Sequence, residues 1–167
     1  SPSPTWRWMA KLVLGLSGES RTNTRSANDY VAGSLGRTGG TTLLAELFPL
    51  PSPDAKVWSE EYRVWYASRA EYEGAVAAWR RGLLAEALDQ SEPRLVLAYG
   101  VRHWPHYRRL FNDVEFGKPE GLDVRFWVGR RGATVVVLSP FLGNGQMSHD
   151  ALESLIEYLR GEGVELT

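Results

Sequence analysis

The sequence contains no cysteine, which excludes disulfides, thiolate nucleophiles and cysteine-rich zinc sites. A chain without disulfides is typical of a reducing compartment, so we expect a cytoplasmic protein. No apolar run approaches the roughly 20 residues of a membrane span, and no membrane partner is expected. An excess of charge is also lacking, because 19 basic and 20 acidic residues give a formal net charge of −1. A nucleic-acid partner would therefore have to be attracted by a local patch.

The length of 167 residues suits a single α/β domain over residues 1–167. The chain does not begin with Met, and its opening Ser-Pro-Ser-Pro is typical of a linker. We therefore expect an N-terminally incomplete domain, the C-terminal part of a larger one. We also expect a monomer. Residues 17–40 are polar and rich in glycine, which predicts a long flexible loop with a short helix around Ala27–Ser34.

Apolar periodicity and continuous apolar runs predict alternating helices and strands. Helices are expected at Trp6–Leu16, Arg69–Gln90, His103–Phe111 and Ser148–Arg160. Buried parallel strands are expected at Arg94–Tyr99 and Thr134–Leu138, with an edge strand at Val124–Val128. This order predicts a three-layer α/β/α sandwich with a small, mostly parallel sheet.

The loop Ser139–Ser148 is the strongest candidate for a working surface. It follows a buried strand, and ligands bind beyond the carboxyl ends of parallel strands. The amides of Asn144 and Gln146 suit the edge of a base, and the helix that follows aims its N-terminal amides at the loop, which favours a phosphate. The alternative interpretation is a glycine-rich turn capped by Ser148.

A second candidate surface is the segment 102–131, in which basic and aromatic residues are interleaved. It carries seven basic residues against four acidic ones, and it also holds Trp104, Tyr107 and Trp127. Such a mixture suits nucleic acid, and a solvated helix face is the alternative. The candidate nucleic-acid-binding residues are Arg37, Arg102, Arg108, Arg130 and Arg131.

No metal or organic cofactor is expected. The three histidines are His103, His106 and His149, and their spacing matches no recognised metal motif. The stretch Gly33–Thr42 contains Arg37 among glycines, but it lacks the Gly-Lys-Ser/Thr ending of a phosphate loop.

Three short segments resemble the C-terminal part of the uracil-DNA glycosylase superfamily. They are Phe48-Pro-Leu-Pro-Ser-Pro53 after an apolar run, Arg94-Leu-Val-Leu-Ala-Tyr-Gly100 before a helix, and Val135-Val-Val-Leu-Ser-Pro-Phe141 before a small-residue loop. The resemblance spans Thr41–Arg160 and concerns the order and character of the loops.

The resemblance implies a DNA partner, base flipping and hydrolysis of a glycosidic bond. In that scheme Phe48 stacks on the flipped base, Asn144 and Gln146 line the pocket or the DNA gap, and Met147 acts as a wedge. Ser139 stands where the family has a histidine, and it donates a hydrogen bond without supplying a positive charge. The family's first motif, with its water-activating Asp or Asn, has no counterpart in this sequence. The implied activity is therefore that of an atypical glycosylase acting on a modified base.

Two other functions fit the same residues. One is a non-catalytic nucleic-acid-binding or regulatory domain, in which the basic and aromatic surface is kept and hydrolytic residues are absent. The other is an enzyme that binds a small molecule or nucleotide through the same loops, since a fold does not determine a function.

Overall fold

The computed structural model describes residues 3–19, 24–51, 56–143 and 145–166. The chain divides into two compact units. The first unit comprises Ser1–Leu44 and Glu92–Thr167, and the second comprises Ala45–Ser91. Each unit is described by itself below.

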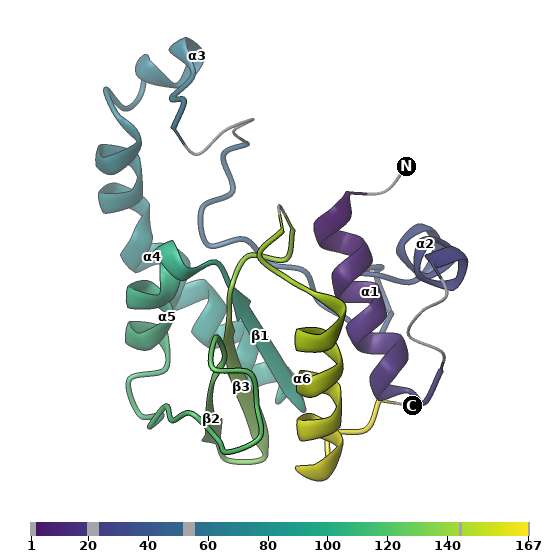
Figure 1. Ribbon diagram of the computed structural model, residues 1–167. Helices are drawn as coiled ribbons and strands as arrows, with labels where there is room; N and C mark the ends of the chain where they lie inside the picture. Colours follow the sequence, from purple (N-terminus) through teal and green to yellow (C-terminus); the bar gives the residue numbers. More distant parts are fainter. Residues whose placement is uncertain (1–2, 20–23, 52–55, 144, 167) are drawn as a thin grey trace. The chain divides into compact units, whose positions relative to one another are not determined.

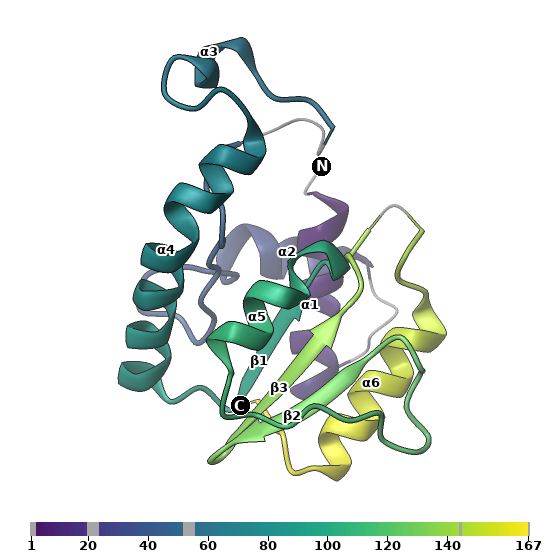
Figure 2. The same ribbon diagram turned by 90° about the vertical axis from the view of Figure 1, so that its left-hand side faces the viewer.

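The first unit is built on a three-stranded mixed sheet with the order β1-β3-β2 (Figure 2). Strand β1 (Leu95–Tyr99) pairs in parallel with β3 (Thr134–Ser139), in a register that sets Tyr99 opposite Ser139. Strand β2 (Trp127–Arg131) pairs with β3 in the antiparallel direction. The two predicted parallel strands are thus present; β3 is buried as expected, whereas β1 is mostly half-buried.

The prediction of a mostly parallel sheet is wrong, because the sheet is mixed. Only Gly132 and Ala133 separate β2 from β3. So short a connection permits antiparallel strands only, since a parallel pair needs a crossover of a dozen residues or more. Gly132 has a φ of +58°, a conformation that glycine adopts without steric penalty. The edge strand also lies a few residues later than the expected Val124–Val128.

Helices α1 (Pro4–Leu16) and α6 (His149–Gly161) lie side by side against one face of the sheet (Figure 1). Leucines of both helices share the main core with alternate residues of the strands, such as Val135 and Val137, because side chains of a strand point to opposite faces in turn. Ser148 begins α6 by accepting a hydrogen bond from the Ala151 backbone N–H at 3.2 Å, as its N-cap position predicts.

The segment 17–40, predicted as a long flexible loop with a short helix around Ala27–Ser34, contains a helix close to that position. Helix α2 (Thr24–Gly33) occupies its middle and packs against α1. Ala27, Val31 and Leu35 recur every four residues and are buried together with Ala10 and Leu14 of α1. This small apolar stripe is enough to hold α2 against α1.

The remaining helices of the first unit follow β1. The chain passes through Gly100 into the short 3-10 helix η1 (Val101–His103) and then into α5 (Trp104–Leu110). Helix α5 contacts β1, and Phe111 just beyond it is buried. The predicted helix at His103–Phe111 is therefore present.

The second unit contains the short helix α3 (Glu60–Arg63) and the long helix α4 (Arg69–Ser91). Helix α4 confirms the prediction at Arg69–Gln90. Near its start, Tyr72 is buried among other aromatic rings, with Trp58 stacked at a centroid distance of 5.6 Å and Tyr66 at 5.3 Å. No helix within the described ranges has the length and apolar character needed to cross a membrane.

Candidate functional site

The carboxyl ends of β1 and β3 meet at one edge of the sheet, as the sequence predicts for parallel strands. Hydrogen bonds from the residues that follow β1 already occupy carbonyl oxygens at this edge. The carbonyl oxygen of Ser139 accepts hydrogen bonds from the Gly100 N–H at 3.0 Å and from the Trp104 indole at 3.1 Å. The Tyr107 hydroxyl donates to the Tyr99 carbonyl at 3.4 Å. Burial and, second, the neighbouring Tyr99 raise the pKa of Tyr107 to about 12, so its hydroxyl remains a neutral donor.

The end of β3 and the loop that follows it turn two of the expected ligand-binding side chains inward. Ser139 is fully buried, and its hydroxyl donates to the Pro140 carbonyl at 2.9 Å. Met147 is only 5% exposed and belongs to the main core, together with Leu142. Met147 is therefore not placed as a wedge, and Ser139 does not present its hydroxyl at the surface. The reason is packing, because apolar side chains at both ends of the loop fill the space between β3 and α6.

Gln146 is the residue of this loop whose side chain faces outward as predicted. It is exposed, and its Oε1 accepts a hydrogen bond from the Phe141 N–H at 3.4 Å. The predicted partner in base recognition, Asn144, lies outside the described residues. Among the described residues predicted to bind a base in this loop, Gln146 is exposed, whereas Ser139 and Met147 are buried.

Arg125 holds the loop in place, a role that its sequence position does not reveal. Its guanidinium binds the carboxylate of Asp123 and donates to the Gln146 carbonyl at 2.8 Å and to the Ser148 hydroxyl at 3.4 Å. Hydrogen bonding to Arg125 is the main cause that lowers the pKa of Asp123. Arg125 therefore serves the structure of the loop rather than a ligand.

Three of the five arginines predicted to bind nucleic acid are engaged by their own chain. Arg130 forms an ion pair with Glu162 at 2.5 Å, and Arg131 forms one with Asp113 at 3.4 Å. Arg37 donates to the Ala32 carbonyl at 2.6 Å. The two ion pairs neutralise positive charges that a count of residues in the sequence treats as free to bind nucleic acid. The count misses the partner of Arg130, because Glu162 lies about thirty residues further along the chain. Arg102 is exposed on η1.

Arg108 belongs to a cluster of cations and aromatic rings, which we call the Trp127 patch. The patch consists of Arg108, Phe116, Lys118 and Trp127. The Arg108 guanidinium lies 5.0 Å from the centre of the Trp127 ring and 5.2 Å from that of Phe116. The Lys118 amine lies 4.8 Å from the Trp127 ring. Both rings are half-buried and both cations are exposed, so the rings fix two positive charges at the surface.

Phe48 lies in the second unit, where its ring meets that of Tyr72 edge-on at 6.0 Å. An open groove of about 540 Å³ is present in the same unit. Its lining residues are Pro49, Leu50, Trp65, Tyr66, Tyr72, Val76, Trp79 and Arg80. Residues 45–91 carry eight acidic against five basic side chains, an excess that repels a phosphate backbone. The groove therefore suits an apolar group better than nucleic acid.

The fold and these surfaces define the first unit as a mixed α/β domain with a small cationic and aromatic patch. Comparisons of the chain with protein-family models, with curated proteins and with solved structures gave no match. What the protein does is therefore inferred from its own residues. Among the described residues, no group of three or more histidine or acidic side chains is placed to hold a metal ion.

Proposed function

We propose that the first unit binds nucleic acid through the Trp127 patch, without cleaving it. The observation that carries the proposal is the pair of exposed cations, Arg108 and Lys118, held over one tryptophan ring. A cation that is already ordered loses less conformational entropy when it meets a phosphate. The patch therefore supplies two pre-positioned contacts for a phosphodiester backbone.

The contacts of Trp127 indicate how nucleic acid would bind. Its ring is half-buried and already in contact with two cations, so a base could stack on it only by displacing one of them. Contacts to phosphates fix position and carry no sequence information. We therefore propose weak binding that depends on salt and not on base sequence, with Arg102 as a further exposed cation.

Fluorescence polarisation with labelled single-stranded and duplex oligonucleotides at several salt concentrations tests this proposal. Removing both cations in R108Q/K118Q lowers the slope of log affinity against log salt by about 1.5, since each lost phosphate contact contributes about 0.7 to 0.9. Arg130→Gln is the matched control, because Arg130 is already paired with Glu162. No measurable binding, or an equal loss in the double variant and the control, would overturn the proposal.

Glycosylase activity is the second candidate, and the meeting of the β1 and β3 ends at one edge of the sheet favours it. The buried hydroxyl of Ser139 and the core position of Met147 weigh against it. Release of a base from a panel of oligonucleotides with modified bases separates the two candidates. Turnover would replace the binding proposal, whereas binding without release supports it.

We propose that the helices around the mixed sheet complete a three-layer α/β/α arrangement, and that the protein acts in the cytoplasm as a monomer. A nucleotide-binding enzyme is the remaining alternative. Competition by mononucleotides, but not by oligonucleotides, would favour that alternative.

A further inference from the structure

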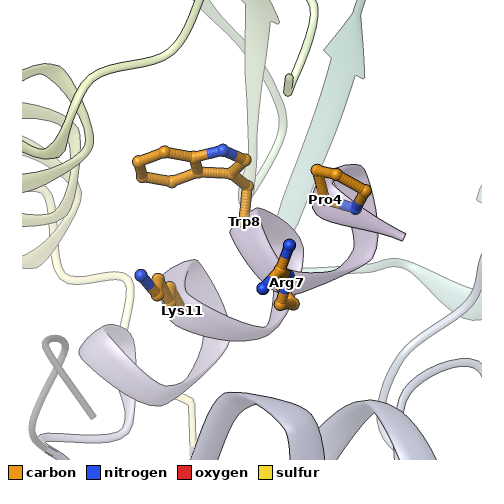
Figure 3. A pocket seen from close by; sticks show the side chains of 4 residues that line it. All are labelled: Pro4, Arg7, Trp8 and Lys11. Atoms are coloured by element: carbon orange, nitrogen blue, oxygen red, sulfur yellow. The ribbon is translucent and has the colours of Figure 1, made fainter. Parts of the chain in front are cut away.

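Helix α1 carries a small hollow that lies apart from the Trp127 patch in both sequence and composition. The hollow has a volume of about 170 Å³ and is lined by Pro4, Arg7, Trp8 and Lys11 (Figure 3). In Figure 3 the Trp8 ring and the Lys11 amine project to the same side of the helix. The volume is below the roughly 300–1,000 Å³ of sites for drug-sized ligands, so it suits a small group.

The hollow holds two like charges without a counter-charge. Arg7 and Lys11 are four residues apart on one helix, a spacing at which like charges repel each other. Among the described residues neither has an acidic partner within ion-pair distance. Over residues 1–44 the sequence has five basic residues against two acidic ones, Glu19 and Asp29. The local potential is therefore positive.

Lys11 is buried to an extent that is unusual for an unpaired lysine. It is 8% exposed, and burial, followed by the charge of Arg7, lowers its pKa. An ammonium group in such a place is unfavourable unless an anion or a hydrogen-bond acceptor compensates it. An anion bound beside Lys11 would offset both effects, because it favours the charged form of the amine.

An aromatic contact holds the Lys11 amine in place. The Lys11 amine lies 5.2 Å from the centre of the Trp8 ring. On α6, the ring of His149 lies 4.9 Å from the same Trp8 ring, at an angle of 51°. Trp8 also packs against the main core. The hollow is thus anchored to two helices and is not a feature of a single mobile side chain.

We propose that this hollow is a binding site for a phosphate group, with Lys11 and Arg7 as its ligands and Trp8 as its wall. A dianion neutralises both cations, and the guanidinium of Arg7 can donate two parallel hydrogen bonds to phosphate oxygens. The group can come from inorganic phosphate or from the end of a nucleotide chain, because both present the same terminal oxygens. The site does not depend on the Trp127 patch.

Titration of the whole, isotope-labelled protein with inorganic phosphate at constant ionic strength tests the site. The probe is the indole N–H signal of Trp8, assigned by comparison with Trp8→Phe. We expect a saturable shift in the native protein, and an affinity about tenfold lower or worse in Lys11→Met and Arg7→Gln, since each removes one charged contact. Lys11→Met keeps an unbranched apolar stem, so the packing of that stem is preserved.

Lys118→Gln is the control, because Lys118 belongs to the Trp127 patch and we expect it to bind phosphate like the native protein. A dinucleotide with a 5′-phosphate and the same dinucleotide with a 5′-hydroxyl distinguish the two sources. A shift caused only by the phosphorylated form assigns the site to nucleotide ends, and equal binding of free phosphate assigns it to the inorganic ion. Lack of saturation, or unchanged affinity in folded Lys11→Met and Arg7→Gln, would refute the site. Loss of binding in Lys118→Gln alone would also refute it.

Discussion

The guanidinium of Arg125 binds both carboxylate oxygens of Asp123, through Nε at 2.9 Å and through Nη2 at 3.0 Å. The same guanidinium donates to the Gln146 carbonyl at 2.8 Å. Asp123 thus fixes the orientation of Arg125, and Arg125 ties down the loop before α6. Asp123 and Arg125 are two residues apart, and through Arg125 the pair holds a loop about twenty residues further along the chain.

Removing this clamp should loosen the loop without unfolding the domain. In Arg125→Met we expect faster hydrogen exchange of the amides at Gln146–Ser148, and a free energy of unfolding lower by about 1 kcal/mol, because the pair is partly exposed to solvent. Exchange measured by mass spectrometry and urea denaturation report the two effects. Arg109→Met, on the exposed side of α5, should change neither. Unchanged exchange in Arg125→Met would show that the loop is held by its apolar anchors alone.

The same pair predicts how stability depends on pH. The pKa of Asp123 is lower in the folded protein than in the unfolded chain, so its contribution is fully present above the unfolded value, near 3.8. That contribution is lost as the pH falls through the lower, folded pKa. The stability difference between the native protein and Asp123→Asn should therefore be constant near neutral pH and shrink in acid. Thermal unfolding at pH 7 and below pH 4 measures it, and a difference that grows in acid would contradict this account.

A substitution at Met147 distinguishes two roles for its side chain, packing in the core and contact with DNA. Because its side chain lies in the main core, Met147→Ala should lower the free energy of unfolding by about 2–5 kcal/mol. The affinity of the remaining folded protein for an oligonucleotide should be unchanged. Gln146→Ala, at the exposed neighbouring position, should cost about 0.5 kcal/mol or less. A stable Met147→Ala protein with weakened DNA binding would instead support the role of a wedge.

Gly129 is required by close packing against the segment that precedes β2. A Cβ atom at this position would overlap Cγ1 of Val114 and lie 2.7 Å from the Glu115 carbonyl oxygen. Gly129→Ala should therefore destabilise the first unit by about 1–3 kcal/mol, the usual cost of overpacking. Gly82→Ala is the contrasting variant, because a Cβ there meets no atom and the helix α4 should gain about 0.5–1 kcal/mol. Chemical denaturation measures both, and equal effects would show that the contact at Gly129 relaxes freely.

Much of the local structure could be predicted from the sequence. The continuous apolar runs that form β1 and β3 indicate buried strands, and the spacing of leucines at three and four residues in α6 indicates a helix that covers them. These features depend on neighbours along the chain, so they are visible without the fold. Helix α2 lies close to the short helix expected around Ala27–Ser34, and its apolar stripe packs against α1.

The candidate site was harder to predict, because it depends on which groups meet across the chain. Composition counted Arg130 and Arg131 as available cations, but Glu162 and Asp113 neutralise them. Composition also gave no reason to single out Arg7 and Lys11, which look like ordinary helix residues in the sequence. They stand out only once the fold shows that both line one hollow and that neither forms an ion pair with an acidic residue among the described residues. The presence of cations is a property of the sequence, whereas their pairing is a property of the fold.

Three properties of this protein are visible in its sequence alone: the mixture of helices and strands, the lack of cysteine chemistry, and the interleaving of basic and aromatic residues in the segment 102–131. The burial of Ser139 and Met147, and the sharing of the Trp127 ring by Arg108 and Lys118, are visible only in the folded protein. The physical reason is that burial and charge pairing depend on distances in space. A loop side chain turns inward where the surrounding side chains leave space in the core, and it turns outward where the core is already filled.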